Sequence, residues 1–85
     1  MATYKISFKK SVLKDFRAIP KKHLIKILEL IKLLEIDPRP ADCKKLTNQE
    51  KYRLRQGSYR ILYSIKDMEL TIWIVKVSHR RNVYH

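Results

Sequence analysis

The sequence contains one cysteine, one glycine, three prolines and no long apolar run. The single cysteine, Cys43, excludes an internal disulfide and is typical of a protein from a reducing compartment. The three histidines are too scattered to form a recognisable zinc motif. The first residues lack the apolar segment of a signal peptide, and no apolar run approaches the roughly 20 residues of a membrane-spanning helix. We therefore expect no metal, no cofactor and no membrane segment, and a location in the cytoplasm.

Acidic residues are also scarce. Twenty Lys and Arg residues stand against eight Asp and Glu residues, which gives a net charge of +12 at pH 7. So large a charge on so short a chain attracts polyanions in a salt-dependent manner, and nucleic acid is the natural polyanion. Charge alone does not separate an enzyme that acts on RNA from a structural RNA-binding protein. It also leaves open binding to an anionic membrane surface or to an acidic protein.

The N-terminal half of the chain has the pattern of one strand and two helices. Alternating apolar and polar residues predict a strand over residues 4–8. Apolar residues at helical spacing predict helices over 12–19 and 20–36, which form an antiparallel hairpin that turns at Pro20. The apolar stripe of the second helix is wide, and it predicts contacts on two sides, with the first helix and with a sheet.

The C-terminal half has the pattern of strands. Strands are predicted over residues 52–55, 59–66 and 70–77, with a turn at the only glycine, Gly57. Consecutive strands with short connections form an antiparallel meander. Trp73 is interpreted as core or sheet packing rather than as an RNA contact. The sequence thus predicts one α+β domain over residues 1–85, in the order strand, helical hairpin, three-strand meander.

Three arginines are predicted to share one face of this sheet. Arg53 and Arg55 are two residues apart in a strand and therefore point the same way. Arg60 on the next strand joins them if the apolar residues of both strands face the helices. An open antiparallel face often carries charged residues that are merely solvated. A site is indicated by the combination with the basic C-terminal residues, which are His79, Arg80, Arg81, Tyr84 and His85.

Three segments together resemble the RelE branch of the RelE/ParE toxin superfamily. They are Tyr-Arg-Leu-Arg at 52–55, Gly-Ser-Tyr-Arg-Ile-Leu-Tyr at 57–63 and Val-Ser-His-Arg-Arg-Asn-Val-Tyr at 77–84. The order of predicted elements agrees along nearly the whole chain. The resemblance implies a helical hairpin packed on a twisted antiparallel sheet. It also implies metal-independent cleavage of messenger RNA in the ribosomal decoding site, and a cognate antitoxin that binds the toxin in a hetero-oligomer and blocks it.

The same resemblance implies a set of site residues. The positions that match the family's catalytic residues are Arg53, Arg55, Arg60, Arg80 and Tyr84. The best-known members have lysines where this chain has Arg53 and Arg55. Because arginine is a poor proton acceptor, we expect electrostatic roles for these two. The further residues expected to contact RNA are Lys51, Lys76 and Arg81.

Two residues are candidates for proton transfer. The ordinary pKa of histidine lies near neutrality, so His79 suits acid–base catalysis, although the matching position varies in the family. The alternative is a histidine that contacts phosphate or lies at the surface. Tyr84 is a candidate for stacking on a base or for acting on the 2′-hydroxyl, but a residue so close to a chain end can also lack a role.

Three functions are compatible with these features. The first is a ribosome-dependent endoribonuclease, the second a ParE-like protein that inhibits DNA gyrase by binding, and the third an RNA-binding protein without catalysis. The fold alone does not decide among them, because function depends on the site. The full set of arginines together with Tyr84 favours the first, since the gyrase-directed branch usually lacks that set.

Overall fold

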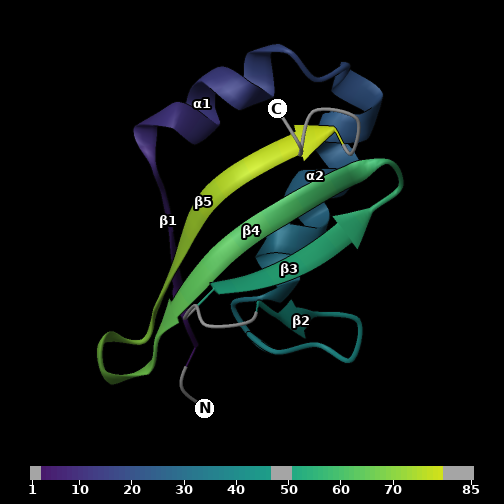
Figure 1. The fold of residues 1–85 in the computed structure, drawn as a ribbon. Helices are drawn as coiled ribbons and strands as arrows, with labels where there is room; N and C mark the ends of the chain where they lie inside the picture. The colour runs from purple at the N-terminus through teal and green to yellow at the C-terminus, as the bar shows by residue number, and fades with distance from the viewer. Residues whose placement is uncertain (1–2, 47–50, 80–85) are drawn as a thin grey trace.

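The computed structural model describes residues 3–46 and 51–79, which form an α+β fold with two helices and a five-strand mixed sheet (Figure 1). The elements in chain order are β1 (Lys5–Phe8), α1 (Lys10–Arg17), α2 (Lys21–Leu33), β2 (Lys44–Lys45), β3 (Lys51–Gln56), β4 (Tyr59–Lys66), a 3-10 helix (Asp67–Glu69) and β5 (Thr71–His79). The strand order across the sheet is β1-β5-β4-β3-β2. The predicted fold class, with its strand, helical pair and antiparallel meander, is confirmed. None of the helices in these two ranges is long and apolar enough to cross a membrane.

Two features of the sheet differ from the prediction. The sheet is mixed, because β1 pairs in parallel with β5, with Lys5 opposite Thr71. A fifth strand, β2, pairs antiparallel with β3, with Lys44 opposite Arg53. Two residues are too few to show a period of two, and a partner more than sixty residues away leaves no local pattern. The antiparallel sheet expected from the resemblance is therefore corrected in both respects.

The second helix is shorter and less covered than predicted. It ends at Leu33, three residues before the predicted end, and the chain then turns towards Pro38, whose ring prevents helical continuation. The side of α2 that faces the sheet is buried. The other part of its apolar stripe, which was predicted to contact the first helix, is exposed to solvent. The exposed apolar residues of this segment are Ile25, Leu28, Leu33 and Ile36.

The core lies between the helices and one face of the sheet. Figure 1 shows α2 behind β3 and β4, and α1 beside β5, with the chain reversing direction between the helices. The buried side chains are Val12, Ile19, Ile27, Ile31, Leu34, Leu54, Tyr59, Ile61, Tyr63, Ile72, Ile74 and Val77. Alternate residues of β4 belong to this core, so Arg60, Leu62 and Ser64 lie on the opposite side, as predicted. We call this opposite side, which the helices leave uncovered, the free face.

A β-bulge in β5 changes which of its side chains reach the free face. The register with β4 shifts at Val75, which has no partner in the ladder. Ile74 and Val77 are both buried although they are three residues apart, a spacing that strict alternation does not allow. Lys76 and Ser78 consequently lie on the free face. Without the bulge, alternation from Ile74 would direct Lys76 into the core.

The linker after α2 is fastened to the base of the sheet by a polar cluster. One guanidinium nitrogen of Arg39 lies 2.8 Å from Oδ2 of Asp67, and its Nε donates to the Tyr52 hydroxyl oxygen at 3.2 Å. The Tyr4 hydroxyl donates to Oδ1 of Asp67 at 2.7 Å. These bonds join β3, the 3-10 helix and the residue before β1 to the linker, and so fix the segment that leads into β2.

This cluster predicts a pH-dependent contribution to stability. The Arg39 guanidinium and then the Tyr4 hydroxyl hold the pKa of Asp67 below its ordinary value of 3.8. A group whose pKa is lowered on folding adds stability above its unfolded pKa and loses that contribution as the pH falls through the folded value. We expect Asp67→Asn to lower the urea midpoint at pH 7, and the difference from the native chain to shrink below about pH 4.

Glu69→Gln is the matched control, because it removes an exposed carboxylate from the same 3-10 helix. Its urea midpoint should equal that of the native chain at both pH values. A midpoint for Asp67→Asn that is unchanged at pH 7 would contradict the role given to the cluster.

Candidate functional site

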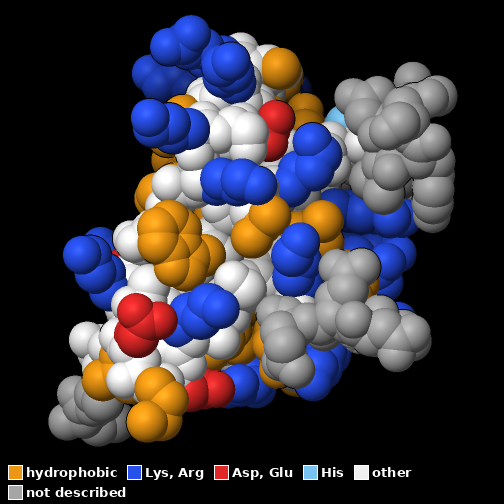
Figure 2. All heavy atoms as spheres, turned by 60° about the vertical axis from the view of Figure 1, so that its left-hand side comes forward, with side chains coloured by type: hydrophobic (Ala, Val, Ile, Leu, Met, Phe, Trp, Pro, Cys, Tyr) orange, Lys and Arg blue, Asp and Glu red, His pale blue; other side chains and the backbone are white. Residues whose placement is uncertain are grey.

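The free face carries positive charge and no carboxylate on any described strand. Residues directly opposite one another on paired strands share a face, so the register identifies its members. The basic residues on the free face are Lys5, Lys44, Lys51, Arg53, Arg55, Arg60, Lys66 and Lys76. None of the strand residues within 5–8, 44–45, 51–56, 59–66 and 71–79 is Asp or Glu. Figure 2 shows the resulting excess of Lys and Arg over Asp and Glu on one side of the molecule.

A small pocket lies at the centre of this charge. Arg53 is opposite Leu62, which is in turn opposite Lys76 on β5. The pocket has a volume of about 170 Å³. It is lined by Leu46, Arg53, Arg60, Leu62, Lys76 and Ser78, and we call it the arginine pocket. A second hollow of about 290 Å³ adjoins it at Arg53 and is lined by Asp42, Lys44, Arg53 and Arg55.

Two arginines of the free face stand directly opposite each other. Arg55 on β3 pairs with Arg60 on β4. Like charges in directly opposed positions of a sheet repel and lower stability. An anion bound between them removes that repulsion and forms charge-assisted hydrogen bonds with both guanidinium groups. This pair is therefore suited to hold a phosphate.

The structure brings together several of the predicted site residues. Arg53, Arg60 and Lys76 line the arginine pocket, and Arg55 and Lys51 lie on the same face. The remaining predicted residues lie outside the described part of the chain, and their roles stay predictions. They are Arg80, Arg81 and Tyr84.

His79 lies on the other side of the sheet. It is opposite Tyr59, whose side chain belongs to the core face, and the two rings meet edge-on with centroids 5.2 Å apart. The Tyr59 ring also contacts the His23 ring at 5.5 Å. Alternation along β5 explains the placement, since Ser78 is the neighbour that faces the arginine pocket. The structure therefore does not bring His79 together with the arginines, and its acid–base role stays a prediction.

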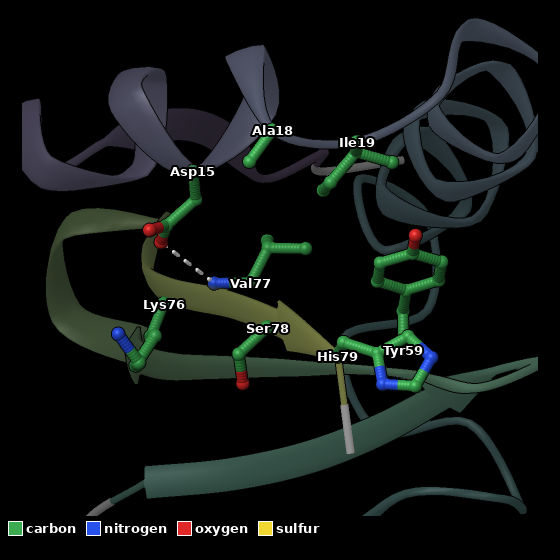
Figure 3. Close-up of a pocket in the computed structure, with 8 residues that line it drawn as sticks. All are labelled: Asp15, Ala18, Ile19, Tyr59, Lys76, Val77, Ser78 and His79. Atoms are coloured by element: carbon green, nitrogen blue, oxygen red, sulfur yellow. Dashed lines mark hydrogen bonds between the residues drawn. The ribbon is translucent and has the colours of Figure 1, made fainter. Parts of the chain in front are cut away.

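His79 belongs instead to a cleft between α1 and β5 (Figure 3). The cleft has a volume of about 320 Å³, and Lys76 and Ser78 point away from α1 at its rim. Oδ2 of Asp15 accepts a hydrogen bond from the backbone N–H of Val77 at 3.2 Å. The pairing of β1 with β5 ends at Ile74, so this carboxylate satisfies a backbone donor that β1 does not reach. The acid of the cleft thus has a structural role.

Sequence reasoning missed two contributors to the free face. Leu46, next to β2, closes one side of the arginine pocket, and no periodic pattern marked that short strand. Trp73 is outside the buried core, contrary to the core placement considered for it, and 41% of its surface is exposed. The sequence did contain a signal for this placement. Trp73 stands between Ile72 and Ile74, which are buried on the helix side, and alternate residues of a strand point to opposite faces.

Carboxylates, histidines and the cysteine do not gather into a metal site in the described ranges. No group of three or more His, Cys, Asp or Glu side chains lies close enough together there to hold an ion. The functional groups that the free face offers for binding and catalysis are guanidinium and ammonium groups.

Residues 6–84 match a family model described as the ParE toxin of the type II toxin–antitoxin system parDE. The chain belongs to the RelE/ParE toxin family. It is 35% identical to the putative toxin RelE1 of Methanocaldococcus jannaschii, covering 95% of this chain and 94% of that protein. It is 27% identical to toxin RelG of Mycobacterium tuberculosis, covering 95% of each.

Solved structures agree with this membership. The toxin chain of an archaeal RelE–RelB complex from Pyrococcus horikoshii is 33% identical, with a TM-score of 0.84 over 95% of this chain and 99% of that one. A RelBE2 toxin–antitoxin complex from Mycobacterium tuberculosis gives 28% identity and a TM-score of 0.82, over 93% of this chain and 100% of that one. This RelE/ParE-family chain is thus a type II toxin of the RelE kind.

Proposed function

We propose that this RelE-family toxin is a ribosome-dependent endoribonuclease that cleaves messenger RNA without a metal and thereby inhibits translation. The observation that supports the proposal best is the arginine pocket, in which Arg53, Arg60 and Lys76 converge on a face without strand carboxylates. RNA supplies both the polyanion that such a face attracts and, in its 2′-hydroxyl, an internal nucleophile.

The reaction needs positioning, charge stabilisation and two proton transfers. The 2′-oxygen attacks the adjacent phosphorus, the bond from phosphorus to the 5′-oxygen breaks, and a 2′,3′-cyclic phosphate and a 5′-hydroxyl result. One proton leaves the 2′-hydroxyl and one is delivered to the departing 5′-oxygen. Ideal in-line placement supplies roughly 7–11 kcal/mol of the barrier reduction, and each well-aimed donor at the developing charge supplies roughly 3–4 kcal/mol.

The proposed roles follow from placement on the sheet. Arg60 is half-buried between β3 and β5, so its guanidinium is held by rigid strands, and we assign it to the scissile phosphate together with Arg80. Arg55, opposite Arg60, assists. Arg53 binds a neighbouring phosphate. Tyr84 is the proposed residue for stacking on a base or for proton transfer at the 2′-hydroxyl.

The test is cleavage of messenger RNA in a translating extract. The native chain should cut at codon positions, and the cuts should vanish with Arg60→Ala and with Arg80→Ala. Arg17→Ala is the matched control, because it removes the same charge from an exposed position on α1 and should cut like the native chain. Intact messenger RNA in the presence of folded native protein would reject the proposal.

The proposal includes an antitoxin partner. The toxins from Pyrococcus horikoshii and Mycobacterium tuberculosis were solved as complexes with antitoxins. On this chain, the exposed end of α2 forms an apolar groove of about 270 Å³, bounded by Leu33, Ile36 and Pro40 among others. Such a groove suits an amphipathic segment of a partner, and acidic residues of that partner would complement the free face.

The description of the matching family model favours a second candidate, a ParE-type inhibitor of DNA gyrase. That function requires binding and no nuclease chemistry. A supercoiling assay with purified gyrase separates the two. Inhibition of supercoiling together with intact messenger RNA would support the second candidate, and messenger RNA cleavage with unaffected supercoiling would support the first.

A further inference from the structure

The largest apolar side chain of the protein stands on the free face. Trp73 is the only tryptophan of the chain, and 41% of its surface is exposed. It lies on β5, one of the interior strands of the sheet, with β1 on one side and β4 on the other. Burial of a tryptophan contributes strongly to a core, so its placement on an uncovered sheet face gives up a large apolar contribution to folding.

Small and basic residues surround this indole. Its direct neighbours across the sheet are Ser7 on β1 and Ser64 on β4, whose short side chains leave the ring uncovered. Each of the four longer strands places one lysine at a nearby free-face position, beside Thr71 and Leu62. These lysines are Lys5, Lys51, Lys66 and Lys76. Within residues 3–46 and 51–79, neither an aromatic ring nor a guanidinium group stacks on Trp73. Figure 2 shows hydrophobic side chains standing among Lys and Arg on this side of the molecule.

The indole is close to the arginine pocket. Ser64, opposite Trp73, is itself opposite Lys51, and Lys51 lies two residues from Arg53 along β3. Trp73 and Arg53 are therefore separated by two strand spacings, about 10 Å, across the sheet and by about 7 Å along it. A single-stranded polyanion held by the pocket can reach the indole along a path lined by ammonium groups.

We propose that Trp73 is a base-stacking subsite for single-stranded RNA beside the arginine pocket. This inference rests on the proposed function, because the strand that stacks on Trp73 is the one that the pocket holds. Every nucleobase has a π-face, so stacking on an exposed aromatic ring tolerates different sequences. The surrounding lysines hold the phosphates on either side of the stacked base. Exposed aromatic rings on an open sheet are a general means of binding unpaired bases.

An anionic membrane surface would also accept an aromatic ring among lysines. RNA is favoured here because the subsite is continuous with the arginine pocket, whose paired guanidinium groups match the geometry of phosphate. Binding of anionic lipid in place of RNA is one of the outcomes that the test below distinguishes.

The single tryptophan makes the test direct, since all indole fluorescence comes from Trp73. The probe is a short 2′-O-methyl oligoribonucleotide, which binds but cannot be cut because it lacks the nucleophile. Its binding should quench Trp73 emission, whereas inorganic polyphosphate should bind with a similar salt dependence and leave the emission unchanged. Trp73→Ala should weaken oligonucleotide binding by about 5- to 100-fold, the effect expected for one stacked base.

Matched variants separate stacking from charge and from misfolding. Trp73→Phe should restore most of the affinity, and Leu13→Ala, which shortens an exposed apolar residue on α1, should leave it unchanged. Trp73→Ala should keep the native salt slope of binding, whereas Arg53→Ala should reduce that slope by about one.

Two results would overturn the inference: native affinity in folded Trp73→Ala, or emission that changes with anionic phospholipid vesicles but not with the oligonucleotide. The readout is independent of cleavage. Quenching by the oligonucleotide without any cut in messenger RNA would support the stacking subsite and contradict the proposed nuclease function. Cleavage by the native chain without quenching would support the nuclease function and contradict the stacking subsite.

Discussion

Replacement of Arg60 by alanine is expected to slow messenger RNA cleavage by about 10²- to 10³-fold, the loss typical of one preorganised donor at a developing negative charge. Arg60 is the basic residue of the arginine pocket that lies on the central strand, between Arg55 on β3 and Ser78 on β5. Its loss also removes a like-charged neighbour of Arg55. We therefore expect the variant to stay folded, so that the effect falls on catalysis.

Single-turnover cleavage on programmed ribosomes, with thermal unfolding measured in parallel, checks this result. Arg60→Lys should be intermediate, because an ammonium group keeps the charge and loses the planar pair of donors. Arg17→Ala should cut at the native rate. If Arg60→Ala cuts within about threefold of the native rate while folded, the phosphate-binding role assigned to Arg60 is wrong.

Replacement of Ile74 by lysine is expected to prevent folding. The bulge at Val75 is what allows Ile74 and Val77 to be buried together. Ile74 is fully buried, so the substitution places an ammonium group in the core under the helices. Burial of an unpaired ammonium group costs several kcal/mol, and the lost burial of isoleucine adds about 1.5 kcal/mol or more.

A chain of this length has a free energy of unfolding of roughly 4–13 kcal/mol, so the substitution removes most or all of it. Circular dichroism and urea unfolding measure the outcome. Val75→Lys is the control, since it introduces the same charge at the neighbouring, partly exposed position and should retain a cooperative transition. An Ile74→Lys variant with the native urea midpoint would contradict the core placement of Ile74.

The part of the fold that sequence predicted is the part recorded in local periodicity. Alternation in β4 separates Tyr59, Ile61 and Tyr63 from Arg60 within eight consecutive residues, and the structure confirms that separation. The parallel pairing of β1 with β5 depends on residues at opposite ends of the chain, and no local pattern records it. β2 consists of two lysines, which have no apolar period to detect.

The site was predictable to the same extent. The common face of Arg53, Arg55 and Arg60 follows from a period of two. The arrival of Lys76 beside them depends on the bulge, which requires both β4 and β5 to be seen in register. The placement of His79 depends on the same register, and it separates the histidine from the arginines with which it was grouped in the sequence.

The position of β5 in the sheet has a consequence for how the toxin is made. The last described strand lies between the first strand and β4, so β1 has no partner until Thr71–Ile74 has been synthesised. A pairing between segments so far apart in the sequence forms late and slowly. While translation is in progress, the arginines of β3 and β4 are already present, but the sheet that holds them in register lacks β5. The arginine pocket, which takes Lys76 and Ser78 from β5, is therefore complete only after this last strand has been synthesised.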